Sequence, residues 1–230
     1  MAQKVNVVLV HGAWADGSSW AHVIPLLQKK GYSVVGAQLP LTSLEDDVAA
    51  TKKLLATVDA PAVLVGHSYG GAVITNAANG SSNVKALVYI AAFGPDEGES
   101  LDSLSKQGPP PAGAAQVRPD AAGFLWVNRD GFAKAFAGDV DPAEANVMAA
   151  VQGPLSLKSF AGKTSAPAWK RLPSWYLVAS NDLMIPPDGE RFMGKRMGAK
   201  LREVPSSHAV MVSHPHEVAD LIGEAAASLG

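Results

Sequence analysis

Ser68 is the residue whose surroundings most clearly favour covalent chemistry. It occupies the centre of Gly66-His67-Ser68-Tyr69-Gly70, a G-x-S-x-G pattern that forms a sharp, strained turn between a strand and a helix. The glycines two residues to either side lack side chains, so the two arms of the turn can approach closely. The pattern predicts a nucleophilic serine whose hydroxyl is exposed at the edge of a sheet.

A serine hydroxyl attacks a carbonyl only when a base removes its proton and an acid orients that base. Where this turn carries the nucleophile, the acid and the histidine come later in the chain, each just past a strand. Asp182 follows the apolar run 175–179 and is the predicted acid. Asp96, which follows the run ending near Ala92, is the alternative. Asp188, beyond two prolines, fits the first turn of a helix.

His208 is the predicted base among the six histidines. It follows the weaker strand pattern at 200–204, and the segment between Asp182 and His208 has room for one helix and one strand. His214 and His216 flank a proline where a helix is expected to start, and they remain alternatives.

An attacking serine creates negative charge on the carbonyl oxygen, which backbone N–H groups must stabilise. The residue after the nucleophile, Tyr69, is one predicted donor. The second is expected from the loop that follows the apolar run 5–10 and reads His11-Gly12-Ala13-Trp14. We predict Ala13 as this donor, with Trp14 as the alternative.

Short runs rich in apolar and β-branched residues predict the strands that position these groups. They are residues 5–10, 33–39, 62–65, 84–91, 175–179 and 200–204. Amphipathic segments between them predict helices, one begun by Ser43 and another by Pro215. Such alternation favours right-handed crossovers and a doubly wound parallel sheet.

Residues 93–173 interrupt this alternation and contain no convincing strand pattern. A gap of this length predicts an insertion, here a helical lid, within a single domain 1–230 whose core is 1–92 and 174–230. Aromatic residues that can line an apolar pocket under the lid are Trp14, Phe124, Trp126, Phe132, Phe136 and Trp169. The alternative is that these aromatic residues only pack the lid onto the core.

The composition narrows the classes of partner and cofactor. The formal net charge is −2, and no basic stripe suggests a nucleic-acid partner. There are no cysteines, which excludes disulfides and thiolate metal sites and suits a cytoplasmic location. The apolar run at 5–10 is too short for a signal peptide or a membrane span. No histidine–carboxylate set has metal-ligand spacing, and no Gly-x-Gly-x-x-Gly is present. We therefore expect no metal and no cofactor.

Four segments together resemble the α/β-hydrolase superfamily. They are His11-Gly12-Ala13-Trp14, Gly66-His67-Ser68-Tyr69-Gly70-Gly71, Asn181-Asp182-x-x-Ile185-Pro186 and Ser207-His208. Within that superfamily the chain is similar to small bacterial hydrolases related to plant methylesterases and hydroxynitrile lyases. The resemblance implies an eight-stranded sheet that lacks its first two strands here, so we expect a mostly parallel sheet of about six strands. It also implies that the insertion is a cap over the active site.

Two positions separate the branches of this superfamily. The lyase branch carries a threonine directly after the histidine of the His-Gly loop and a lysine directly after the catalytic histidine. This chain has Gly12 and Ala209 at those positions. The resemblance therefore favours hydrolysis of a small carboxylic ester through an acyl-enzyme. A carbon–carbon bond hydrolase or lyase, and a non-catalytic small-ligand receptor, remain alternatives, and both monomer and homodimer remain open.

Overall fold

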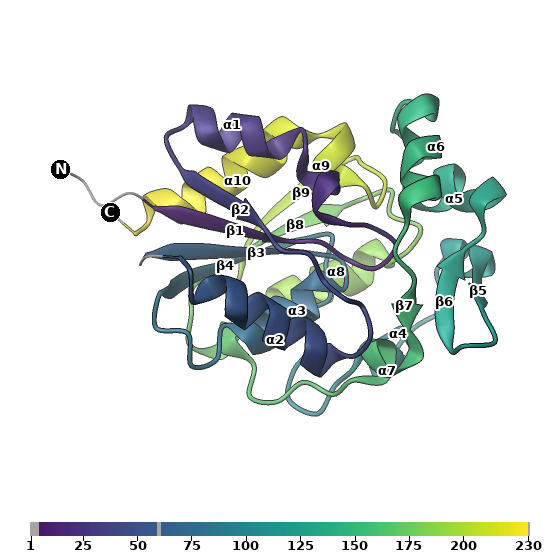
Figure 1. Cartoon of the computed structure of the whole chain (residues 1–230), viewed down its shortest axis with the longest axis horizontal. Helices are drawn as coiled ribbons and strands as arrows, with labels where there is room; N and C mark the ends of the chain where they lie inside the picture. The colour runs from purple at the N-terminus through teal and green to yellow at the C-terminus, as the bar shows by residue number, and fades with distance from the viewer. Residues whose placement is uncertain (1–4, 59–60, 230) are drawn as a thin grey trace.

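The computed structural model describes residues 5–58 and 61–229, and its centre is a six-stranded parallel sheet (Figure 1). In spatial order the strands are β2 (Ser33–Gly36), β1 (Asn6–Val10), β3 (Ala62–His67), β4 (Val84–Ile90), β8 (Ser174–Ala179) and β9 (Lys200–Val204). The predicted α/β class and the sheet of about six parallel strands are confirmed. The apolar run 5–10, which was judged too short for a signal peptide, contains β1.

The strand order reverses between the neighbouring strands β1 and β3. From β1 the chain moves outward to β2, returns to β3 and then proceeds to the opposite edge. In open parallel sheets, ligands bind beyond the carboxyl ends of the strands at such a reversal. The loop after β1 carries Ala13 and the turn after β3 carries Ser68, so both lie at this position.

Helices cover both faces of the sheet (Figure 1). One face is covered by α1 (Val23–Lys29) and α10 (Pro215–Ala227), and the other by α2 (Leu44–Leu55), α3 (Gly70–Ala77) and α8 (Pro187–Arg196). The side chains of the inner strands β3 and β8 are buried on both faces, as expected for a parallel sheet between helix layers.

Local sequence signals set the ends of two helices. The hydroxyl of Ser43 accepts a hydrogen bond from the backbone N–H of Asp46 at 3.0 Å and caps the start of α2. Pro215 occupies the first turn of α10, where a missing N–H costs no hydrogen bond. Both helices therefore begin where the sequence predicts.

Residues 93–173, between β4 and β8, contain the cap, most of which lies beyond the carboxyl ends of the strands (Figure 1). The last residues of this range instead pack against α3. Its helical elements are α4 (Leu101–Ser105), η2 (Ala112–Gln116), α5 (Arg129–Phe136), α6 (Pro142–Val151), α7 (Leu157–Ala161) and η3 (Ala168–Lys170). It also contains an antiparallel sheet of β5 (Val117–Pro119), β6 (Phe124–Val127) and β7 (Leu155–Ser156). The predicted helical cap insertion is confirmed, but the small sheet within it was not predicted. These strands have only two to four residues, too few to produce an alternating pattern.

No helix in the described ranges is long and apolar enough to cross a membrane.

Candidate active site

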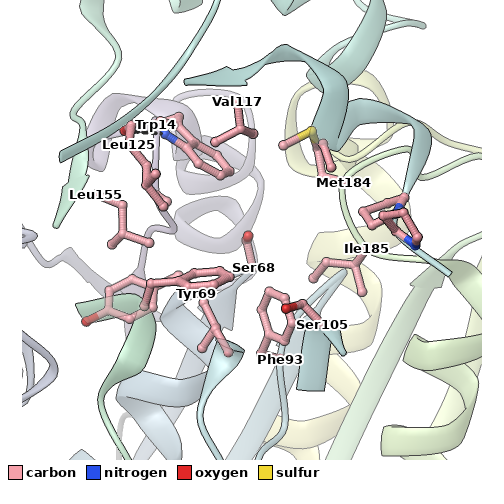
Figure 2. A pocket seen from close by; sticks show the side chains of 16 residues that line it. Trp14, Ser68, Tyr69, Phe93, Ser105, Val117, Leu125, Leu155, Met184 and Ile185 are labelled. Atoms are coloured by element: carbon pink, nitrogen blue, oxygen red, sulfur yellow. Dashed lines mark hydrogen bonds between the residues drawn. The ribbon is translucent and has the colours of Figure 1, made fainter. Parts of the chain in front are cut away.

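Ser68 lies in a backbone conformation that side chains rarely adopt, with φ 53°. It sits between the end of β3 and the start of α3. A Cβ added at Gly66 would lie 2.5 Å from the carbonyl oxygen of Gly70, and one added at Gly70 would lie 2.6 Å from the carbonyl oxygen of His11. The two glycines are therefore required by close backbone contact, and they allow the strained turn that directs the Ser68 hydroxyl into a cavity (Figure 2).

The structure brings Ser68, His208 and Asp182 into one hydrogen-bonded chain. Nε2 of His208 lies 2.8 Å from Oγ of Ser68, and Nδ1 of His208 lies 2.5 Å from Oδ2 of Asp182. All three side chains are buried. Because the carboxylate can only accept at neutral pH, Nδ1 of His208 carries the proton and Nε2 is free to accept the serine proton.

The Asp182 carboxylate is held by the loop that follows β8. Its Oδ1 accepts hydrogen bonds from the backbone N–H groups of Met184 at 2.6 Å and Ile185 at 2.9 Å. Its own N–H donates to the carbonyl of Ala179 at 3.1 Å. With Oδ1 occupied in this way, Oδ2 is directed at His208.

The alternative acid and bases lie elsewhere. Asp96 pairs with Lys170 at 2.5 Å. His214 forms a hydrogen bond with the Ser213 hydroxyl at 3.0 Å, and His216 is exposed in the first turn of α10. None of these side chains belongs to the hydrogen-bonded chain of Ser68.

Of the three predicted oxyanion donors, two have free N–H groups. Within residues 5–58 and 61–229, the N–H groups of Ala13 and Tyr69 donate no hydrogen bond, and both residues border the cavity that Ser68 faces. The N–H of Trp14 donates to the carbonyl of Gly153 in the cap at 2.8 Å. The geometry therefore favours Ala13 and Tyr69 over Trp14.

Two neutral histidines hold the loops around Ser68. Nδ1 of His11 donates to the Gly12 carbonyl at 2.8 Å, and Nε2 accepts from the N–H of Leu39 at 2.9 Å. Burial lowers the pKa of His11. Nε2 of His67 donates to the backbone carbonyl of His208 at 2.9 Å, and burial, followed by the nearby His208, lowers the pKa of His67 well below 6.5.

A buried carboxyl that the sequence reading did not single out supports the side chain of Tyr69. Oδ2 of Asp47, on α2, accepts a hydrogen bond from the Tyr69 hydroxyl at 2.5 Å, and Oδ1 accepts from the N–H of Leu41 at 2.7 Å. Burial raises the pKa of Asp47 to about 6, although these two hydrogen bonds oppose the shift. In the sequence Asp47 is one of three acidic residues in a helical first turn, which is an ordinary surface pattern.

A second buried carboxyl lies behind the triad. Oε2 of Glu190, on α8, accepts from the N–H of Ala179 at 3.1 Å, and the side chain is fully buried. Burial and the neighbouring charge of Asp182 raise the pKa of Glu190 well above 4.5. No sequence signal distinguished Glu190 from Asp188, the exposed acidic residue of the same helix.

The hydroxyl of Ser68 faces an apolar cavity of about 220 Å³ (Figure 2). Its lining comprises Ala13, Trp14, Ser68, Tyr69, Phe93, Leu101, Ser105, Pro110, Pro111, Ala114, Val117, Leu125, Leu155, Phe160, Met184 and Ile185. No residue of this lining carries a formal charge. The surroundings of Ser68 therefore suit an uncharged group.

Of the six aromatic residues predicted to line the pocket, Trp14 borders this cavity and the other five do not. Phe132 and Phe136 lie one helical turn apart on α5 and are fully buried. The ring of Phe136 packs edge-on against the ring of His208, with centroids 4.8 Å apart. These two side chains therefore pack the cap onto the core, which is the alternative the sequence left open.

The remaining three predicted aromatic residues also lie outside the cavity lining. Trp169 is buried outside the cavity lining, and its Nε1 donates to the carbonyl of Pro95 at 2.9 Å. Phe124 and Trp126 alternate with the cavity residue Leu125 along β6, so they point to the opposite face of the cap sheet. Nε1 of Trp126 donates to Asp120 at 2.9 Å on that face.

The described ranges hold no group of three or more histidine, aspartate or glutamate side chains arranged to bind a metal ion.

Comparison with known proteins identifies a family for this chain. A model of the alpha/beta hydrolase family matches residues 7–221. A pyrethroid hydrolase of Sphingobium wenxiniae is 26% identical over 251 residues, which cover 95% of this chain and 86% of the relative. A carbendazim hydrolyzing esterase of Nocardioides sp. is 36% identical over 127 residues, which cover 48% of this chain and 51% of the esterase. Methylesterase 3 of Arabidopsis thaliana is 25% identical, with 97% of both chains covered.

Solved structures agree on the fold. The crystal structure of the pyrethroid hydrolase PytH with BIF superposes with a TM-score of 0.84 at 23% identity and covers 99% of both chains. Polyneuridine aldehyde esterase superposes with a TM-score of 0.81 at 18% identity and covers 96% of this chain and 99% of its own. At these identities the likeness concerns the path of the chain.

Proposed function

Because the chain belongs to the alpha/beta hydrolase family and is a carboxylic ester hydrolase, we propose that it cleaves a small uncharged ester through an acyl-enzyme on Ser68. His208 is the general base and acid, and Asp182 orients it. The N–H groups of Ala13 and Tyr69 stabilise the oxyanion. The observation that carries this proposal is the buried chain of hydrogen bonds from Ser68 through His208 to Asp182.

In the first half of the reaction, Nε2 of His208 takes the proton of Ser68 as Oγ bonds to the ester carbonyl carbon. The carbonyl oxygen becomes an oxyanion, and each backbone donor that meets it contributes about 3 kcal/mol to the transition state. The carbon–oxygen bond to the alcohol then breaks, and His208 returns the proton to the leaving alkoxide. Asp182 stabilises the imidazolium that exists between the two transfers.

In the second half, water takes the place of the alcohol. His208 removes a proton from the water as its oxygen attacks the acyl carbon, and the same two N–H groups hold the second oxyanion. Breaking the bond to Oγ releases the carboxylic acid, and His208 returns its proton to Ser68. The net reaction consumes one ester and one water and forms one acid and one alcohol, with no cofactor.

The test compares wild type with Ser68→Ala on p-nitrophenyl acetate and with a fluorophosphonate probe. We expect the substitution to remove essentially all turnover, because one residue supplies the attacking atom. We also expect the probe to label Ser68 of the folded wild type and to leave the variant unlabelled. Wild-type turnover in the variant would refute the proposal. Absence of labelling in the folded wild type would favour the receptor alternative.

The lyase alternative receives no support at Gly12. A Cβ at this position would lie 2.6 Å from Cβ of Ser68, so the present backbone has no room for the threonine that the lyase branch carries. Ala209, the position of the lyase lysine, is fully buried. A panel of esters and cyanohydrins separates the two reactions, and we expect turnover of the esters alone.

A further inference from the structure

A second apolar cavity adjoins the one that Ser68 faces. Its volume is about 420 Å³. Five residues line both cavities: Phe93, Ser105, Pro111, Met184 and Ile185. In Figure 2 four of these side chains, all but Pro111, are labelled, and they lie together on one side of Ser68. The two cavities are therefore lobes of one binding space, and the shared residues form the neck between them.

The walls of the second lobe come from the cap and from α8. On the cap side they are Leu104 and the segment Gln107–Pro109. On the other side they include Gly189, Phe192 and Met193. The lining contains one charged residue, Asp188, whose side chain is 95% exposed and pairs with Arg191. The charge thus points to solvent, and the interior of the lobe suits an apolar group.

The exposure of Phe192 also indicates that the second lobe binds an apolar group. Its side chain is 51% exposed, which is unusual for a large aromatic residue. One side of its ring faces the guanidinium of Arg196, whose carbon lies 5.2 Å from the ring centroid. Because the same residue lines the second lobe, an apolar ligand there would cover surface that is now in contact with water.

The volumes of the two lobes also indicate that they form one binding site. Binding sites for small organic ligands commonly have about 300–1,000 Å³. The lobe at Ser68 has about 220 Å³ and falls short of that range, whereas the two lobes together lie within it.

We propose that the second lobe binds an extended apolar arm of the substrate, an alkyl chain of several carbons or an aryl group. The substrate class is then an elongated, uncharged ester whose carbonyl lies at Ser68 and whose arm passes the neck between Phe93 and Ile185. This inference rests on the proposed ester hydrolysis and adds a specificity site to it. The arm belongs either to the acyl group or to the alcohol, and the experiment separates these two.

Gly189 allows the lobe to be filled from a rigid helix. It lies in the first turn of α8, and a Cβ added there meets no atom within 4 Å. Gly189→Leu therefore places an isobutyl group at the lobe without a backbone clash, and replacing a helical glycine favours the helix. The matched control is Gly223→Leu on α10, where an added Cβ meets only the tips of the Lys30 and Tyr32 side chains, at 3.8 Å or more. Gly223 lies outside both lobes.

The assay uses two series of esters. One lengthens the acyl chain of p-nitrophenyl esters from acetate to decanoate, and the other lengthens the alcohol of alkyl acetates from ethyl to decyl. In one series we expect wild-type kcat/KM to rise by up to about fourfold per methylene group until the lobe is filled. Gly189→Leu is expected to lower the ratio of long-chain to short-chain kcat/KM in that series at least tenfold. Gly223→Leu should retain the wild-type ratio.

Phe192→Asp provides a second variant that keeps the test decisive if Gly189→Leu folds poorly. Its exposed position tolerates a charge, yet the carboxylate would face the apolar arm, so the long-chain advantage should again fall. The series that responds identifies whether the acyl group or the alcohol occupies the lobe. If the wild type turns over acetates but its rate does not depend on chain length, or neither variant changes that dependence, the inference is overturned while the proposed function stands. Failure to turn over any ester would instead overturn the proposed function.

Discussion

The free energy of unfolding of the wild type is expected to fall as the pH rises, and Asp47→Asn is expected to abolish this fall. The pKa of Asp47 is raised from 3.8 to about 6 in the folded protein. Between these two values the folded state holds a proton that the unfolded chain has released, so the free energy of unfolding falls as the pH rises. The shift corresponds to about 3 kcal/mol at pH values above the folded pKa, at about 1.4 kcal/mol per pH unit. Roughly 2.4 kcal/mol of this falls between pH 4 and pH 7.5.

Asparagine resembles the protonated form of Asp47 in shape and charge. It therefore changes the stability by an offset that is nearly independent of pH. The measurement is urea unfolding of both proteins at several pH values from 4 to 7.5, and the quantity of interest is the difference between their unfolding free energies. We expect this difference to move by about 2 kcal/mol or more in favour of the variant. A difference constant to within about 0.5 kcal/mol would show that Asp47 ionises normally and would refute the reasoning.

Tyr69→Phe is the partner control. The Tyr69 hydroxyl donates to the Asp47 carboxylate and holds the pKa of Asp47 below the value that burial alone would give. Removing it should raise the pKa of Asp47 further and enlarge the loss of stability at neutral pH. In the Asp47→Asn background the same substitution should have no pH-dependent effect, because the titrating partner is gone.

Asp182→Asn is expected to lower kcat by about 10³–10⁴-fold with little change in fold, because the base loses its orienting charge. Ester hydrolysis kinetics measure the fall in kcat, and circular dichroism checks that the fold is kept. Gly12→Ala introduces a Cβ 2.6 Å from that of Ser68, and kcat/KM should fall about 100-fold or more. Gly36→Ala, where an added Cβ meets no atom within 4 Å, should not show this fall. Glu190→Gln should gain stability relative to wild type as the pH rises from about 5 to 9, because the folded-state pKa of the acid is raised; urea unfolding that shows the opposite trend would mean that the acid is ionised in the fold.

The sequence predicted the elements whose signals are local. Parallel strands buried on both faces appear as short apolar runs, and the G-x-S-x-G turn places Ser68 between one such run and a helix. The positions of Asp182 and His208 followed from the same logic, since each comes directly after a strand of the sheet. Turn and strand-end positions of this kind need no knowledge of distant contacts.

The parts that the sequence did not predict depend on contacts between distant residues. The cap sheet pairs Leu125 with Leu155, and strands this short leave no alternating pattern. The pocket prediction relied on aromatic residue types, but the cavity is lined mainly by aliphatic side chains and prolines. Phe132 and Phe136 carried a usable signal, because a spacing of four on one helix is typical of a buried face. Asp47 carried none, since only the tertiary fold buries it.

The contacts of Trp14 bear on how this enzyme could be recombined with its relatives. Its N–H donates to Gly153, and its indole Nε1 donates to the carbonyl of Leu125 at 2.8 Å. Both acceptors belong to the cap, whereas Trp14 directly follows the predicted oxyanion donor Ala13. A chimera that exchanges residues 93–173 alone keeps both bonds only if the new cap places two backbone carbonyls at the positions of Gly153 and Leu125. The transferable unit is therefore the cap together with the loop 11–17, two segments that are separate in the gene but joined in the folded protein.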